Sequence, residues 1–145
     1  AISHDAADPV GYRFKCGNKQ VAVATDMGNY NEYTVECLKG MDLLFLEANH
    51  DVNMLQVGPY PYYLKQRILG DRGHLSNENS GRLLSRVLHD DLKTIVLGHL
   101  SKENNHPDLA YKTMEMHFRS KGIILGKDIQ LTVLKRNTPT GIYSF

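Results

Sequence analysis

The sequence has few cysteines and no long apolar run, and each shortage excludes a class of protein. Its two cysteines, Cys16 and Cys37, do not form a CxxC spacing for a metal, and so few indicate free thiols in a reducing compartment. No stretch approaches the roughly 20 apolar residues of a membrane helix, and no signal-peptide pattern is visible. We therefore expect a cytoplasmic protein without a membrane segment.

An excess of positive charge is also missing. Seventeen Lys and Arg residues stand against sixteen Asp and Glu residues, which leaves a formal net charge of +1. This balance excludes a strongly basic surface that binds nucleic acid over most of the protein, but it leaves a local contact with phosphate open. With 145 residues, 41% of them hydrophobic, the chain can form the core of one domain or of part of a larger one.

Strand and helix patterns alternate along the chain, which predicts an α/β fold. Tyr12–Cys16, a Gly-Asn turn and the apolar run 21–25 predict a hairpin. The apolar segments 42–48 and 94–97 predict strands buried on both faces. The other expected elements are helices from Asn31 to Gly40, over 77–89 and from Pro107 to Gly122, and strands over 128–134 and 142–145.

Polar side chains follow three of the expected strands directly. Asp26 follows the first apolar run, Glu47 ends the second, and His99 follows the third. In α/β proteins ligands bind outside the carboxyl ends of strands, where side chains leave a rigid core toward one crevice. The three strands therefore indicate one site at this edge of the sheet.

Two near-identical stretches, GHLSNEN and GHLSKEN, carry His74 and His99 in different settings. His99 follows a buried strand, a stiff support suited to a metal ligand. His74 precedes a helix that Ser76 can cap, a place that suits a phosphate or a proton donor better. Because their flanks share no pattern, the two stretches are not an internal repeat.

His4, Asp26 and His99 are residue types that borderline metals prefer, since a neutral imidazole binds one ion and a carboxylate can bridge two. Each residue alone is more often an ordinary hydrogen-bonded side chain. The spacing of these three residues therefore favours a metal site only modestly. The longer motifs around them are more specific.

Those motifs are ISHDAADPVGY, VAVATDMG, LLFLEANHD, GHLSN and LGHLSKENN, in this order. They resemble the carboxyl-terminal half of metallo-β-lactamase-fold hydrolases, above all the YycJ/WalJ-like group and more distantly the RNase Z-type enzymes. The resemblance implies that His4 and His99 each bind one of two metal ions and that Asp26 bridges them. It also implies that His74 lies near the scissile phosphate and that Glu47 orients His74.

Three further residues of these motifs are expected to bind substrate: His50, Ser101 and Asn104. The resemblance implies two divalent ions, zinc or manganese, and hydrolysis of phosphodiester bonds by a metal-activated water. DNA is the expected substrate, with exonuclease-like action. The same fold also hydrolyses small esters, thioesters and lactams, which leaves a small-molecule hydrolase as the alternative.

The H-x-H-x-D-H motif, which supplies four ligands in this family, does not occur in the sequence. We therefore expect residues 1–145 to form one partial domain, the carboxyl-terminal half of a four-layer αββα fold. Such a chain would hold metal weakly and be inactive by itself, needing the amino-terminal half or a second chain. A non-catalytic half-domain that assembles with a partner, or as a homodimer, is the other alternative.

Overall fold

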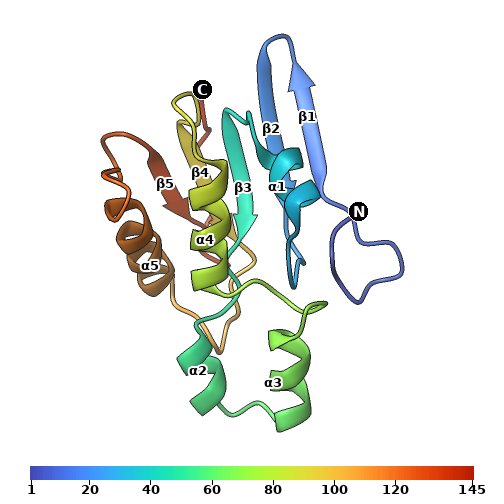
Figure 1. The fold of residues 1–145 in the computed structure, drawn as a ribbon. Helices are drawn as coiled ribbons and strands as arrows, with labels where there is room; N and C mark the ends of the chain where they lie inside the picture. The colour runs from blue at the N-terminus through green and yellow to red at the C-terminus, as the bar shows by residue number, and fades with distance from the viewer.

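The computed structural model describes all 145 residues, and its architecture confirms the predicted α/β class. One five-stranded sheet runs through the molecule in the order β1-β2-β3-β4-β5 (Figure 1). The first pair is antiparallel and the other three pairs are parallel. The strands are β1 (Tyr12–Cys16), β2 (Lys19–Ala24), β3 (Leu43–Glu47), β4 (Thr94–Gly98) and β5 (Gln130–Val133).

The five helices form two groups. Helices α1 (Glu32–Leu38), α4 (Asn77–Val87) and α5 (Pro107–Arg119) lie on one face of the sheet. Helices α2 (Val52–Val57) and α3 (Tyr62–Leu69) form an arm beyond the carboxyl ends of the parallel strands (Figure 1). No helix is both long enough and apolar enough to cross a membrane.

The hydrophobic core lies between the sheet and the layer of α1, α4 and α5. Alternate strand residues such as Leu44, Leu46 and Leu97 point into it and are fully buried. Burying one such leucine contributes roughly 1.5–3 kcal/mol to the free energy of unfolding. Helix α4 covers them with the predicted apolar residues Leu83 and Leu84, which are also fully buried.

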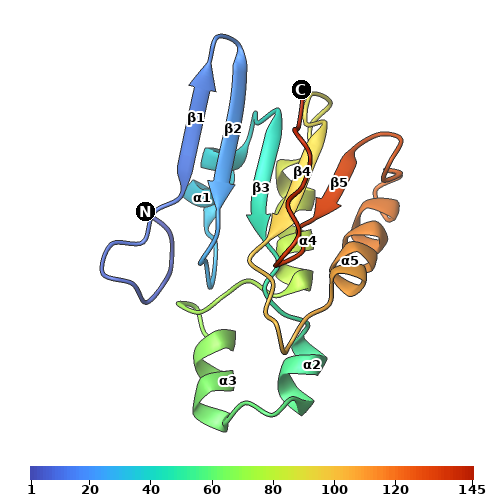
Figure 2. The same cartoon turned by 180° about the vertical axis from the view of Figure 1, so that it is seen from behind.

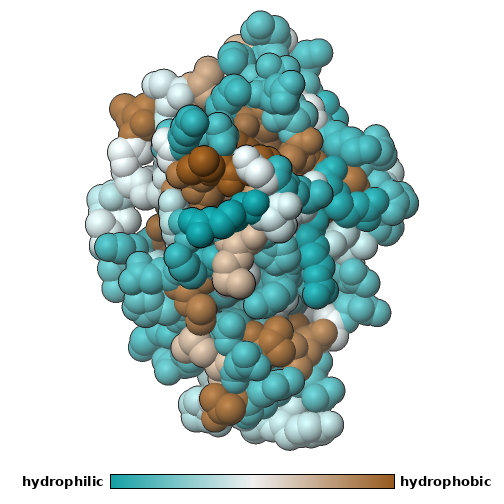
Figure 3. All heavy atoms as spheres, turned by 60° about the vertical axis from the view of Figure 1, so that its left-hand side comes forward, coloured by the Kyte–Doolittle hydropathy of each residue, from teal (hydrophilic) through white to brown (hydrophobic).

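The opposite face of the sheet has no helix against it (Figure 2). Tyr12 and Phe14 lie on this face of β1, stacked on each other and more than half exposed. On the side of the molecule toward α5, by contrast, hydrophilic residues prevail and hydrophobic ones form separate small patches (Figure 3). One sheet face is therefore covered and the other is open.

Local sequence signals placed the starts of α1 and α4 correctly, whereas no residue bounds were predicted for α2 and α3. Asn31 caps α1 through a capping box, in which the backbone N–H of Thr34 donates to Asn31 Oδ1 at 3.0 Å. Ser76 caps α4, with the N–H of Asn79 donating to Ser76 Oγ at 3.2 Å. Such caps stabilise a helix by about 1 kcal/mol and fix where the chain turns into it.

The strand predicted over residues 142–145 is wrong. The segment after β5 runs back along β4 over the open face of the sheet (Figure 2), and no backbone group of residues 135–145 pairs with another. Ile142 is 98% exposed. A segment with strand-forming residues becomes a strand only when a neighbouring strand takes up its backbone hydrogen bonds, and this segment has no such partner.

Candidate metal centre and cleft

The site forms at the carboxyl ends of β2, β3 and β4, where the sequence placed it. Asp26 follows β2 and His99 follows β4, and both have a backbone φ of 57°. This left-handed conformation costs a non-glycine residue roughly 1–2 kcal/mol. Strained backbone of this kind is concentrated at functional sites, where the surrounding structure holds it in place.

Three histidines surround the carboxylate of Asp26. Its Oδ1 lies 3.5 Å from Nε2 of His99 and 3.8 Å from Nε2 of His4. Nδ1 of His74 lies 3.9 Å from the same oxygen. The ring of His74 stands between the other two, with centroids 5.0 Å from His4 and 5.1 Å from His99. Residues nearly 100 positions apart thus share one cluster.

Glu47, the last residue of β3, forms hydrogen bonds with two of these rings. Its side chain is fully buried, and Oε1 accepts from Nδ1 of His74 at 2.6 Å and from Nδ1 of His99 at 2.8 Å. Its other oxygen accepts the backbone N–H groups of Met27 and Leu75 at 2.9 and 3.3 Å. Four donors therefore satisfy a carboxylate that would be costly to bury alone.

These contacts determine which nitrogens face the site. Burial raises the pKa of Glu47, but the hydrogen bonds from His74 and His99 outweigh it and bring the pKa below its usual value. The bond to Glu47 in turn raises the pKa of His99. An ionised carboxylate only accepts, so both histidines carry a proton on Nδ1 and turn Nε2 away from Glu47.

The same tautomer holds for His4. Its Nδ1 lies 2.9 Å from the carbonyl oxygen of Gly73, which accepts only, so Nε2 is again the nitrogen turned toward Asp26, and it also lies 3.4 Å from Oδ1 of Asp5. Gly73 and Gly28 pack backbone to backbone here, since a Cβ on Gly28 would lie 2.3 Å from the nitrogen of Gly73. Only glycine allows this approach, which brings the segments of His4, Asp26 and His74 together.

The cluster fits a divalent metal ion by its donor atoms and spacing. Imidazole nitrogens with their Nδ1–H fixed to a carboxylate or carbonyl are a common arrangement around bound metals. Ligands at about 2.1 Å in tetrahedral geometry lie roughly 3.4 Å from one another, close to the 3.5 and 3.8 Å between Asp26 and the nitrogens of His99 and His4. His4, Asp26 and His99 therefore suit a metal ion by these two distances. The groups whose possible ligand atoms all lie within 4.8 Å of one another are His4 with Asp26 and His74, and Glu47 with His74 and His99, so His74 is close enough to be a further ligand.

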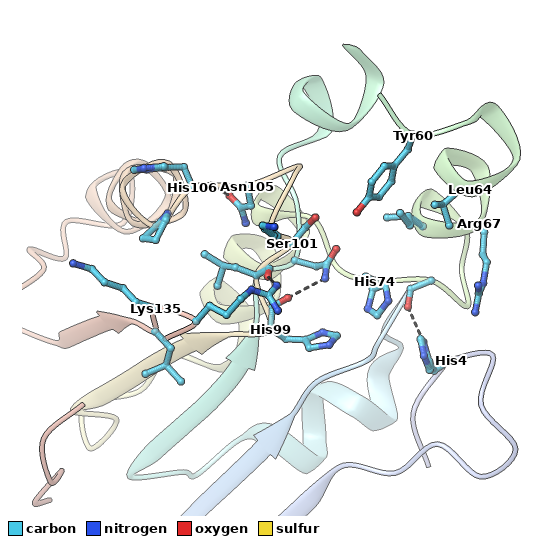
Figure 4. Close-up of a pocket in the computed structure, with 18 of the residues that line it drawn as sticks. His4, Tyr60, Leu64, Arg67, His74, His99, Ser101, Asn105, His106 and Lys135 are labelled. Carbon is cyan, nitrogen blue, oxygen red and sulfur yellow. Dashed lines mark hydrogen bonds between the residues drawn. The ribbon is translucent and has the colours of Figure 1, made fainter. Parts of the chain in front are cut away.

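A cleft of about 940 Å³ opens beside the cluster. Figure 4 shows His4, His74 and His99 along one side of it, with Tyr60 and α3 on another side and Lys135 and His106 across from them. Basic side chains outnumber acidic ones in the lining, with Arg67, Lys102, Lys135 and Arg136 against Asp5. The cleft therefore suits an anionic ligand.

The predicted substrate-binding residues divide into two kinds. Ser101 lines the cleft, but His50 and Asn104 do not, because they are 1% and 0% exposed. Asn104 instead donates from Nδ2 to Ser101 Oγ at 3.3 Å. Burial lowers the pKa of His50 to about 4, and its Nε2 has no hydrogen-bond partner. Any influence of these two residues on a substrate would pass through their neighbours.

Sequence reasoning missed three residues that contribute to this site. Asn49 donates from Nδ2 to the carbonyl oxygen of His99 at 2.9 Å and thereby supports its left-handed backbone. Lys135 and Arg136 reach the cleft from beyond β5. The basic pair directly after the last strand was a visible signal, but only the sheet order shows that it lies beside β4.

Fold and site together define an α/β protein with a histidine–carboxylate cluster, suited to divalent metal, at the carboxyl edge of its parallel strands. Known proteins match nearly the whole chain, among them the following two. A protein named exodeoxyribonuclease YycJ from Bacillus anthracis is 37% identical over 141 residues, 97% of this chain and 53% of the relative. One named exodeoxyribonuclease WalJ from Streptococcus pneumoniae is 40% identical over 139 residues, 96% of this chain and 52% of the relative.

The chain is thus a homologue of the YycJ/WalJ group, which confirms the resemblance seen in its motifs. It spans about half the length of these curated relatives. No protein-family model matches the sequence.

Proposed function

We propose that this chain carries part of the active site of a metal-dependent hydrolase that cleaves phosphodiester bonds at the end of a DNA strand. One observation carries the proposal: Nε2 of His4 and Nε2 of His99 lie 3.8 and 3.5 Å from one oxygen of Asp26, beside a cleft with more basic than acidic side chains in its lining. The relatives named exodeoxyribonuclease support the choice of DNA. A hydrolase for small neutral lactams would not need a cleft whose lining carries an excess of basic side chains, of which Lys135 and Arg136 form no ion pair.

Two divalent ions, zinc or manganese, would activate a water molecule and stabilise the negative charge that develops on the phosphate when bound. Asp26 would hold the ions together with His4 and His99, since its Oδ1 lies 3.8 Å from Nε2 of His4 and 3.5 Å from Nε2 of His99. Glu47 keeps the rings of His74 and His99 in one tautomer and orientation, as residues behind metal ligands commonly do.

His74 is the proposed proton donor. Its Nδ1–H is held by Glu47, so its Nε2 is the atom that can carry a second proton toward the cleft. A protonated Nε2 could stabilise charge on a phosphate oxygen or protonate the leaving oxygen. The buried carboxylate of Glu47 would stabilise the resulting imidazolium at a distance of 2.6 Å.

We further propose that residues 1–145 form the carboxyl-terminal half of a four-layer αββα metallo-β-lactamase-like domain. The sheet face without a helix (Figure 2) supports this, because the exposed side chains of Tyr12 and Phe14 lie on it, opposite Val23 and Val21 of β2 in the strand register. A second sheet packed there would bury them. The remaining metal ligands would then come from the half of the relatives that this chain does not match, or from a partner chain.

The test is a nuclease assay on DNA labelled at one end. The chain is assayed alone and together with the region corresponding to the other half of the relatives, with zinc, manganese or a chelator. We expect metal-dependent release of label from the paired halves and none with Asp26→Asn. Turnover that persists in chelator or in Asp26→Asn would contradict the proposal. Turnover of a lactam or thioester without any of DNA would favour the small-molecule alternative.

A further inference from the structure

We propose that a buried pair of side-chain amides, Asn77 and Asn105, positions His74 and His99 for the proposed reaction. This inference rests on the proposed function and adds two residues that act on the site through other residues. The first stretch, GHLSNEN, contains both His74 and Asn77. Asn105 directly follows the second stretch, GHLSKEN, which contains His99. Each histidine is therefore linked to one member of the pair by a few residues of chain.

The two stretches have the same local structure at their serines. The backbone N–H of Asn79 donates to Ser76 Oγ at 3.2 Å, and the backbone N–H of Asn104 donates to Ser101 Oγ, also at 3.2 Å. In both stretches the serine follows the histidine by two residues and binds the backbone three residues further on. Such a local hydrogen bond determines the direction of the chain after each histidine.

The segment after β3 lies between the two stretches and forms hydrogen bonds with both. The backbone N–H of Asn49 donates to the carbonyl oxygen of Leu75 at 2.9 Å. The carbonyl oxygen of Asn49 accepts from the N–H of Ser101 at 2.7 Å. The segment begins at Glu47, whose carboxylate accepts from both histidines. The distance from each stretch to this segment therefore determines whether its histidine reaches Glu47.

The side chains of Asn77 and Asn105 connect the two stretches directly. Nδ2 of Asn77 donates to Oδ1 of Asn105 at 3.0 Å, and Nδ2 of Asn105 donates to Oδ1 of Asn77 at 2.9 Å. Nδ2 of Asn105 also donates to the carbonyl oxygen of Ala48, in the segment between the stretches, at 2.8 Å. Asn77 is 0% and Asn105 7% exposed, so water competes little for these bonds.

Backbone groups determine how the amide of Asn105 is oriented. The carbonyl oxygen of Ala48 only accepts and therefore faces the NH2 group, whereas the backbone N–H of His106 donates to Oδ1 at 2.9 Å. Both hydrogens of the NH2 group are thus used, although Asn105 borders the cleft (Figure 4). Asn105 therefore acts as a positioning residue and has no free donor for a substrate.

The pair holds the start of α4 against the loop that follows β4. Asn77 is the first residue of α4, three residues after His74, and Asn105 lies just before α5, six residues after His99. If one amide is removed, the other is left buried without its partner and regains hydrogen bonds only by moving toward water. That movement would draw one stretch away from Glu47, and the two histidines would no longer share its oxygen.

The test begins with NMR spectroscopy of the imidazole Nδ1–H protons of His74 and His99 in the chain without metal. Their hydrogen bonds to the buried carboxylate should slow the exchange of both protons with water. Asn77→Ala should make this exchange roughly tenfold faster for at least one of them. Zinc affinity, measured by isothermal titration, should fall about tenfold. Asn77→Ser should act in the same direction and serves where Asn77→Ala does not fold.

Asn105→Ala should have the same effects as Asn77→Ala. The double variant Asn77→Ala/Asn105→Ala should lose little more than Asn105→Ala alone, because two residues that act through one contact are not additive. A double variant that loses the full product of both single effects would show that the two residues act separately.

Val87→Ala is the matched control for a loss of stability, because Val87 is buried at the other end of α4 and belongs to neither stretch. It should lower the urea midpoint of unfolding but leave proton exchange and zinc affinity unchanged. Asn53→Ala removes an exposed amide from α2 and should change none of these quantities.

Two further results would overturn this inference. Unchanged proton exchange and zinc affinity in a destabilised Asn77→Ala would make the pair a purely structural feature. Equal changes in Val87→Ala would show that any loss of stability disturbs the site. The proposed function fails separately. Faster exchange in Asn77→Ala, in a chain that neither binds zinc nor hydrolyses DNA with the other half, would contradict the hydrolase and keep the positioning role.

Discussion

The buried carboxylate of Glu47 lies 2.8 Å from Nδ1 of His99, and the same oxygen lies 2.6 Å from Nδ1 of His74. One side chain at the end of the central strand thus fixes the rings of a proposed metal ligand and a proposed proton donor. The structure therefore makes Glu47 the residue on which the geometry of both depends.

Glu47→Gln should weaken metal binding but not abolish it. The side-chain amide of glutamine has one acceptor oxygen and one NH2 group. The NH2 group would face N–H donors whose hydrogen bonds the carboxylate now accepts. We expect metal affinity to fall about 10- to 100-fold and the free energy of unfolding to fall by about 1–3 kcal/mol. Isothermal titration with zinc and urea unfolding measure the two effects.

Glu36→Gln serves as the control for Glu47→Gln. Glu36 is 64% exposed and pairs only with Lys39 on the surface of α1. Its replacement should change neither quantity measurably, because exposed ion pairs contribute little. Unchanged zinc affinity in Glu47→Gln would show that the buried carboxylate does not support the ligands.

His74→Ala separates a proton donor from a metal ligand. If His74 acts on the phosphate, metal content should stay unchanged while turnover of DNA by the paired halves falls roughly 10²–10⁴-fold. His74 also lies within reach of Asp26 and His4, so a ligand role is the competing assignment. Metal analysis after dialysis decides between them, since loss of bound metal would make His74 a ligand.

Asp26→Gly and Asp26→Ala should differ in stability although both lose metal. The φ of 57° at this position costs alanine about 1 kcal/mol relative to glycine, which adopts it freely. The glycine variant should therefore unfold at higher urea concentration than the alanine variant. Equal midpoints would show that the backbone at Asp26 relaxes once the side chain is removed.

His50 should make the chain less stable in acid. Its pKa is about 4 in the folded protein, because burial disfavours the imidazolium, against about 6.5 in the unfolded chain. Between these values the unfolded chain binds more protons, so stability rises with pH and is lost as the pH falls from about 6.5 to 4. The loss should approach roughly 3 kcal/mol.

Urea unfolding at several pH values compares the unchanged chain with His50→Gln, which cannot be protonated. The variant should lose less stability over this pH range, whatever its starting stability. An identical loss in both proteins would assign the acid sensitivity to other groups.

The sequence by itself determined the features that follow from local residue patterns and from the general rules of α/β sheets. Asn31 and Ser76 start their helices because a short polar side chain caps the N–H groups just beyond it. Asp26, Glu47 and His99 meet because the carboxyl ends of parallel strands share one edge. The motifs around them also indicated the YycJ/WalJ group, which the relatives confirm.

Only the tertiary structure decided what depends on distant segments. It showed that Glu47 holds His99 as well as His74, that Asn104 is buried behind Ser101, and that residues 142–145 have no strand to pair with. Lys135 reaches the cleft because β5 lies beside β4 in the sheet. The periodicity of apolar residues shows which side of a helix or strand is buried. It does not show which other element packs against that side, and the site depends on that packing.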